Sequence, residues 1–386
     1  MVKIACLGAG SGYFVGALGD LAVTPGLAGS EVTLYDIDQD KGRLMEQYGR
    51  RLAALSGTGL RVRACASLAD ALAGADYAVS AIGGVGESLS SIYQTGYHLH
   101  DILIPARYGI HQLIGDTAGP AGMMMALRSI PVYLNICHEM EKRCPQALLI
   151  NHSNPMAVLC RAMTKYSRIQ VIGLCHGVQI GIVYIAKVLG VPPEELGTLW
   201  IGTNHYHWFT RIRHRGRDVY PEARARLAAL TGEMRQPMTQ ALSRIYGHAI
   251  VYPYDDHAIE FYPYMTQLAG RVLPYGLDGE LVKWLGEQGY DRDDARLPAH
   301  SPQEVHAARQ AQLADYATQL AAIDLPAGPT TSLQGEPLGR LIEALASGRR
   351  EVYIVNIANR GAVPNLADEA VLEIEAVTDS CGVRGV

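Results

Sequence analysis

The feature that most constrains the fold is a strand-like run that leads directly into a glycine-rich turn near the start of the chain. The run is Val2–Leu7, and the turn is Gly8-Ala9-Gly10-Ser11-Gly12-Tyr13. Glycines between a strand and a helix allow a tight bend and a close approach of the backbone to a pyrophosphate, and the helix N-terminus binds the anion. The turn therefore predicts a parallel α/β sheet of the dinucleotide-binding type.

The glycine fingerprint is incomplete at its third position, where Tyr13 stands and Gly12 comes one place early. A second apolar run, Glu31–Tyr35, ends at Asp36, whose carboxylate can accept hydrogen bonds from ribose hydroxyls and repels a 2′-phosphate. The acid at the end of the second strand favours NAD over NADP. Alternatively, the glycine turn could belong to a sheet that binds another ligand or none. The cofactor-binding residues that we expect from this pattern are Gly8, Gly10, Ser11, Gly12, Tyr13 and Asp36.

Apolar strands alternate with amphipathic helices through the first half of the chain, which is typical of a doubly wound parallel sheet. Helices are expected over residues 12–23, 41–55 and 121–143, the last one broken at Pro131. Further strands are expected over residues 60–65, 77–82, 147–150 and 170–174.

The pattern changes after about residue 195. Strands that could be antiparallel are expected over residues 199–201 and 206–212, a polar helical stretch over 222–244, a loop over 291–302, and late strands over 351–356 and 370–377. Because a single core rarely exceeds about 250–300 residues, the 386-residue chain needs two packed regions. We predict a Rossmann-type NAD-binding domain over residues 1–195 and an α+β substrate and oligomerisation domain over 196–386.

Composition narrows the class of protein. The net charge of -5 gives no basic field for nucleic acid or an anionic membrane, and we see no uncharged apolar run long enough to span a bilayer. The seven cysteines are scattered without a CxxC motif, so a disulfide framework is not expected. The sequence therefore predicts a cytoplasmic enzyme that acts on a small molecule, without a nucleic-acid or membrane partner.

Four polar segments carry the candidate chemistry: residues 115–122, 151–155, 175–177 and 202–208. Asn154 and Cys175 follow predicted strands, so both are expected at the carboxyl edge of the sheet, where open α/β sheets bind ligands. A thiolate and an imidazole from neighbouring segments can hold a divalent ion with positions left open for a substrate. From spacing alone, a buried cysteine and a hydrogen-bonded core histidine are the more common outcome.

These segments, in this order, resemble glycoside hydrolase family 4. The resemblance covers nearly the whole chain and rests on residues 3–11, 35–36, 115–131, 151–155, 175–177, 204–209 and 355–366. It implies the fold of the lactate and malate dehydrogenase superfamily, a homodimer or homotetramer, and the cofactors NAD and a divalent metal of the manganese type. It also implies cleavage of a glycoside by oxidation at sugar carbon 3, elimination across carbons 2 and 1, water addition and re-reduction, instead of the usual carboxylate pair.

Carried over by position, the resemblance makes Cys175 and His205 the metal ligands, with His205 also at the sugar, and makes Asn154 a sugar contact that lies close to the metal and is also cofactor-binding. Asn151 is expected at the sugar because its amide can hydrogen-bond hydroxyls. Asp116 lies in the Gly-Asp-Thr segment beside the sugar and is expected to be catalytic. His176 follows the metal cysteine, as in members that act on unphosphorylated α-glycosides such as α-glucosides, α-galactosides and α-glucuronides. It could protonate the leaving oxygen or only shape the pocket.

The catalytic base is expected in the segment Tyr254–Phe261, where Asp255 matches the family's acid best. Asp256 and the tyrosines Tyr246, Tyr252 and Tyr254 are the alternatives, and His257 could join the site or only hold its loop.

Three other functions fit the nucleotide fold. One is a metal-free 2-hydroxy acid dehydrogenase, one is a sugar carbon-3 dehydrogenase without bond cleavage, and one is a non-catalytic NAD sensor. The number of polar residues at predicted strand ends disfavours the sensor.

Overall fold

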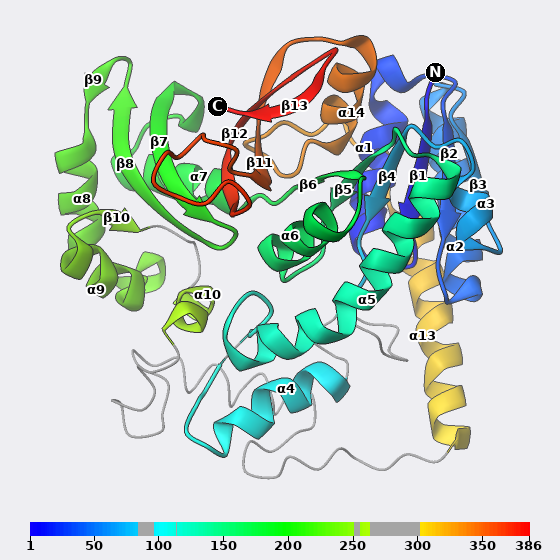
Figure 1. Ribbon diagram of the computed structural model, residues 1–386, viewed down its shortest axis with the longest axis horizontal. Helices are drawn as coiled ribbons and strands as arrows, with labels where there is room; N and C mark the ends of the chain where they lie inside the picture. Colours follow the sequence, from blue (N-terminus) through cyan, green and yellow to red (C-terminus); the bar gives the residue numbers. More distant parts are fainter. Residues whose placement is uncertain (84–95, 113, 251–254, 263–301) are drawn as a thin grey trace.

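The computed structural model describes residues 1–83, 96–112, 114–250, 255–262 and 302–386 (Figure 1). Within them a nine-stranded sheet runs in the order β13-β12-β11-β6-β5-β4-β1-β2-β3. Its parallel part comprises β1 (Lys3–Leu7), β2 (Glu31–Tyr35), β3 (Arg61–Ala64), β4 (Tyr77–Ser80), β5 (Leu148–Asn151) and β6 (Gln170–Gly173). The order 3-2-1-4-5-6 confirms the predicted Rossmann-type doubly wound sheet.

The parallel strands are covered on both faces. In β1, Ile4 and Cys6 face one core while Ala5 and Leu7 face the other, because successive strand residues point to opposite sides. One core includes residues of α1 (Tyr13–Val23), α2 (Gln39–Ser56) and α14 (Leu338–Ser347). The other includes residues of α3 (Leu68–Leu72), α5 (Gly119–Arg143) and α6 (Met156–Tyr166).

The second half begins with a small antiparallel sheet of β7 (Leu196–Thr203), β8 (Tyr206–His214), β9 (Arg217–Asp218) and β10 (Ala249–Ile250). The helices beside it are α7 (Gly177–Leu189), α8 (Tyr220–Ala229), α9 (Pro237–Tyr246) and α10 (Asp255–Ala258). Two further helices are α4 (Gly96–Ala106), which lies along α5, and α13 (Pro302–Ala322), which contacts α2 (Figure 1).

The last strands return to the first sheet. β11 (Glu351–Ala358) pairs antiparallel with β6 through Asn356 and Gly173, and β12 (Val371–Asp379) and β13 (Gly382–Gly385) extend the edge. The small sheet packs on β12, where Trp200 Nε1 donates to the Glu373 carbonyl at 2.9 Å. The large sheet thus takes strands from both sides of residue 195, so the predicted second domain is not spatially separate, and the boundary itself stays a prediction.

Two of the secondary-structure predictions were wrong. α5 continues through Pro131 instead of breaking there, because Ala126, Ser129 and Tyr133 stay buried on either side of the missing N–H. The single helical stretch over 222–244 is two helices, α8 and α9, separated by a short 3-10 turn that starts at Gly232, whose φ is 67°. The loop expected over 291–302 lies outside the described residues except at Pro302, where α13 begins.

Every helix within the described ranges is too short or too polar to cross a membrane.

Candidate active site at the carboxyl edge of the sheet

The glycine turn after β1 lies at the point where the strand order reverses, between β1 and β4. Gly8 has a φ of 76°, and a Cβ there would lie 2.6 Å from the Ala81 carbonyl oxygen at the end of β4. Only glycine fits that close approach without strain. Gly10 is confined similarly, because a Cβ would lie 2.7 Å from Cβ of Lys41 and 3.1 Å from the Asp36 carboxylate.

Asp36 closes the turn from the end of β2. Its carboxylate accepts the Gly10 N–H at 2.8 Å and the Asp38 N–H at 2.7 Å, and burial raises its pKa. At the start of α1 the Tyr13 N–H donates to Ser11 Oγ at 3.3 Å, and a Cβ on Gly12 would meet nothing within 4 Å. A helix N-terminus that opens onto free space beside a glycine turn suits an anionic ligand such as a pyrophosphate, so the turn fits the dinucleotide that the sequence predicts.

The segment after β5 uses its two asparagines differently. Asn151 is fully buried, its Oδ1 accepts from Ser80 and from the Ser153 N–H, and its Nδ2 donates to the Ser153 carbonyl. Its amide is committed to the turn and is not presented to a ligand, which corrects the expected sugar contact. Asn154 donates through Nδ2 to Asp116 at 2.7 Å, and its buried Oδ1 has no hydrogen-bond partner among the described residues. A buried acceptor of this kind suits a ligand hydroxyl.

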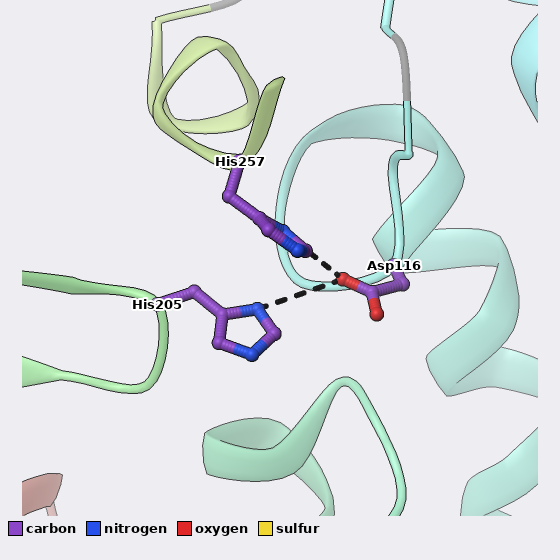
Figure 2. Close-up of side chains that lie close together, drawn as sticks. All are labelled: Asp116, His205 and His257. Atoms are coloured by element: carbon purple, nitrogen blue, oxygen red, sulfur yellow. Dashed lines mark ion pairs between the residues drawn. The ribbon is translucent and has the colours of Figure 1, made fainter. Parts of the chain in front are cut away.

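Asp116, His205 and His257 form a buried cluster from three segments (Figure 2). Asp116 Oδ1 lies 3.7 Å from His205 Nδ1 and 3.6 Å from His257 Nδ1. Burial, followed by the charge on His257, lowers the pKa of His205 to about 3, so His205 is neutral near pH 7. Asp116 is 1% exposed, His205 5% and His257 6%, so all three side chains are buried.

Glu260 ties this cluster together from the short turn that follows α10. Its carboxylate accepts hydrogen bonds from the Thr117 N–H at 2.8 Å, from the Ala118 N–H at 3.1 Å and from His257 Nδ1 at 2.9 Å. Residue 260 therefore fixes the turn that carries Asp116, and burial raises its pKa.

Cys175, His176 and Glu336 form a second cluster, with ligand atoms that all lie within 4.8 Å of one another. Glu336 accepts from His176 Nδ1 at 3.1 Å and from His152 Nδ1 at 2.6 Å. His152 Nε2 in turn lies 2.8 Å from the hydroxyl of Tyr13, in the glycine turn. Burial alone would raise the pKa of Glu336, but the two histidines lower it to about 2, so the carboxylate is charged.

Cys175 is buried, and burial together with Glu373 and Glu336 raises its thiol pKa. A divalent cation reverses that balance and holds the sulfur as thiolate. The side chain of Asn204 lies beside the thiol and lowers its pKa, while the next residue, His205, lies in the first cluster. The two clusters are therefore neighbours, but Cys175 and His205 belong to different ones, and their sharing of one cation stays a prediction.

Asp255, the expected base, lies at the start of the described range 255–262. Asp255 opens α10, but its side chain, like those of Asp256, Tyr252 and Tyr254, lies outside the described residues. His257 on the same helix does join the site. Tyr246 instead packs among aromatic rings, with its ring centroid 6.4 Å from that of Tyr262.

The sequence did not assign roles to Thr117, His152, Glu260 or Glu336. Each acts through a partner that is distant along the chain; Glu336, for example, is 184 residues from His152. Thr117, His152 and Glu260 stand in segments that the sequence singled out, residues 115–122, 151–155 and 254–261, whereas Glu336 stands in none.

Comparisons with known proteins agree with this geometry. Residues 3–191 match the profile of the family 4 glycosyl hydrolases, and residues 200–386 match the C-terminal domain of the same family. An α-galactosidase of Bacillus subtilis is 30% identical over 381 residues, 98% of this chain and 82% of that protein.

Solved structures share the fold. A putative glucosidase, lplD, of Bacillus subtilis superposes with a TM-score of 0.77 at 26% identity, over all of this chain and 86% of that one. A 6-phospho-α-glucosidase from gut microorganisms, solved in complex with NAD and Mn²⁺, gives a TM-score of 0.73 at 20% identity, over all of this chain and 84% of that one.

Proposed function

The chain belongs to the family 4 glycosyl hydrolases, and from that premise we propose that it hydrolyses unphosphorylated α-galactosides with the help of NAD and a divalent cation, manganese. The reaction follows the route of oxidation at sugar carbon 3, elimination, water addition and re-reduction. α-Glucosides and α-glucuronides are the alternative substrates.

One observation carries this proposal: consecutive residues of one loop reach both clusters. Asn204 lies beside the Cys175 thiol, and His205 contacts the Asp116 segment. A sulfur and a neutral imidazole on neighbouring segments make a donor set that can hold a divalent transition-metal ion with open positions for substrate oxygens. We propose Cys175 and His205 as the protein ligands of that ion.

The cofactors supply, when bound, a reversible hydride acceptor and a Lewis acid. The chain supplies orientation and proton transfer. Asn154 Oδ1 is placed to accept a hydrogen bond from a sugar hydroxyl, because Asp116 holds the other end of its amide. Asp116 thus orients the sugar contact through the Asn154 amide, and we propose that this positioning is its part in catalysis.

Two proton transfers remain to be assigned. We propose Asp255 as the base that takes the proton from sugar carbon 2, since it opens the helix that also carries His257. We propose that His176, whose side chain is 48% exposed, protonates the leaving oxygen. The hydrogen bond that His176 donates to Glu336 raises the pKa of His176, which favours a protonated imidazole near neutral pH.

The charge of the site supports a neutral sugar. Asp116 and Glu336 are buried or largely buried carboxyl groups around the proposed ligands. Their field disfavours a phosphate or carboxylate on the substrate. The α-galactosidase relative, which aligns over nearly the whole chain, supports galactose within the neutral sugars.

The test is a panel of nitrophenyl α- and β-glycosides of galactose, glucose and glucuronic acid, with and without a 6-phosphate where the sugar allows it. Each is assayed with NAD, Mn²⁺ and a thiol reductant. We expect the largest kcat/KM on the α-galactoside. Turnover of phosphorylated sugars alone would overturn the proposed substrate class, and no turnover on any glycoside would overturn the proposed function.

We also propose a reducing, cytoplasmic compartment and a homodimer or homotetramer. All seven cysteines are free, including the exposed Cys381, which supports the compartment. Light scattering of the purified protein measures the assembly directly.

A further inference from the structure

We propose that the hydroxyl of Thr117 fixes the tautomer of His205, so that Nδ1 carries the proton and Nε2 presents its lone pair to a divalent cation. The proposal rests on the proposed function only for the identity of the cation. It names Thr117 as a positioning residue, which acts through His205 and does not touch the substrate.

The first step concerns the hydrogen bonds that reach Asp116. Two donors from different segments contact its carboxylate: Thr117 Oγ1 donates to Oδ1 at 2.6 Å, and Asn154 Nδ2 donates to Oδ2 at 2.7 Å. Both carboxylate oxygens therefore act as acceptors.

The second step follows the single proton of the Thr117 hydroxyl. That proton points to Asp116 Oδ1, so it is not available to any other partner. His205 Nδ1 also lies 2.6 Å from Thr117 Oγ1. Two heavy atoms at this distance need one proton between them, and Thr117 has none left to give, so His205 Nδ1–H donates to the hydroxyl oxygen.

The third step concerns the other ring nitrogen. In a neutral imidazole with its proton on Nδ1, Nε2 is an acceptor. Figure 2 shows Nδ1 of His205 turned toward Asp116 and the second ring nitrogen pointing away from it. A metal-binding histidine characteristically donates its other ring N–H to an oxygen acceptor, which sets both tautomer and ring orientation.

The turn that carries Thr117 is itself fixed. Glu260 accepts the backbone N–H groups of Thr117 and Ala118, across more than 140 residues of sequence. The backbone of His205 has a φ of 62°, an unusual conformation for a residue other than glycine. Both observations indicate that the fold holds the backbone of Thr117 and of His205 in place.

The first test measures metal affinity of the NAD-free protein by Mn²⁺ titration, and by the thiolate-to-cobalt absorption band with Co²⁺. Thr117→Val keeps the size of the side chain and removes the hydroxyl, whereas Thr117→Ser keeps the hydroxyl. We expect Thr117→Val to weaken binding by about 10–100-fold, the usual effect of losing such a partner. Thr117→Ser should stay close to the parent protein, and NAD affinity should not change in either variant.

An unchanged Mn²⁺ affinity in Thr117→Val would overturn the proposal, and so would an equal loss in Thr117→Ser, because packing and not the hydroxyl would then be responsible. If Thr117→Val does not fold, Thr117→Ala against Thr117→Ser makes the same comparison.

The second test needs neither metal nor substrate. Nitrogen NMR of protein labelled at histidine reports which ring nitrogen carries the proton, with the His205 signal identified by its loss in His205→Gln. We expect the Nδ1–H form in the parent protein and a mixture in Thr117→Val. An Nε2–H form in the parent protein would contradict the inference even if the enzyme proves to be a glycosidase. The Nδ1–H form in a protein without glycosidase activity would contradict only the proposed function.

Discussion

The carboxylate of Glu336 lies 3.1 Å from Nδ1 of His176, although 160 residues separate them along the chain. The same carboxylate accepts from His152, so one glutamate holds two imidazoles whose Nδ1 atoms both donate. This arrangement fixes the ring that follows the proposed metal cysteine.

Glu336→Gln should therefore impair His176 specifically. A glutamine has one acceptor oxygen for two N–H donors, so one histidine loses its partner and the pKa of His176 falls toward its ordinary value. We expect activity on alkyl α-galactosides, whose leaving groups need protonation, to fall about 10²–10⁴-fold, with a much smaller loss on nitrophenyl α-galactosides. His176→Asn should show the same dependence on the leaving group; an equal loss on both substrates would indicate only structural damage.

Gly12→Ala tests the nucleotide turn without disturbing the fold. A Cβ at Gly12 meets nothing within 4 Å in the protein, so we expect an unchanged melting temperature. The same Cβ intrudes on a pyrophosphate at the start of α1, so the Kd for NAD should rise at least about tenfold, which corresponds to roughly 1.4 kcal/mol. Gly16→Ala, also in open space but one turn further along α1, is the matched control and should bind NAD normally. Normal binding by Gly12→Ala would show that the cofactor does not use this turn.

Metal removal separates the glycosidase from a simple dehydrogenase. Dialysis against a chelator should abolish glycoside hydrolysis, and Mn²⁺ should restore it, because the reaction needs a Lewis acid at the sugar. Cys175→Ser and His205→Gln should not be rescued at ordinary Mn²⁺ concentrations. Full activity after chelation would favour the metal-free dehydrogenase, and accumulation of NADH would favour a sugar dehydrogenase without bond cleavage.

Glu373 gives a test of stability against pH. Burial raises its pKa to about 7, from an ordinary value near 4.5 in the unfolded chain. The folded protein thus holds a proton that the unfolded chain releases, and the free energy of unfolding falls as pH rises from about 4.5 to about 7. The loss is at most about 3 kcal/mol.

Glu373→Gln is uncharged at every pH and should lose less stability than the parent protein between pH 5 and pH 8, measured by urea denaturation. Glu375→Gln, at an exposed position two residues further along β12, is the matched control. Equal pH dependence in Glu373→Gln and the parent protein would mean that Glu373 ionises normally.

Local sequence patterns predicted the nucleotide half well. The order from Val2 to Asp36 fixes β1, the glycine turn, α1 and β2 through neighbouring residues alone, so its prediction was confirmed. Pro131 misled the prediction because buried neighbours along α5 offset the local cost of the proline. The return of β11 to pair with β6 is a long-range event that no local pattern encodes.

The sequence predicted the candidate site only at residues that stand in recognisable motifs. Cys175, His176 and His205 stand in such motifs, and each lies in one of the two clusters. Glu336 stands in no motif, and Glu260 stands in the segment Tyr254–Phe261 without an assigned role; the roles of both depend on hydrogen bonds across more than 140 residues of sequence. Asn151 shows the converse: it lies within a motif, yet its amide is used to hold the turn.

The proposed route is tested most directly by hydrolysis of an α-galactoside in deuterium oxide, followed by analysis of carbon 2 in the released sugar. Elimination removes the proton from that carbon and replaces it from solvent, so the account predicts deuterium there. A product that carries only protium at carbon 2 would contradict it, because the glycosidic bond would then have been cleaved without passing through the elimination.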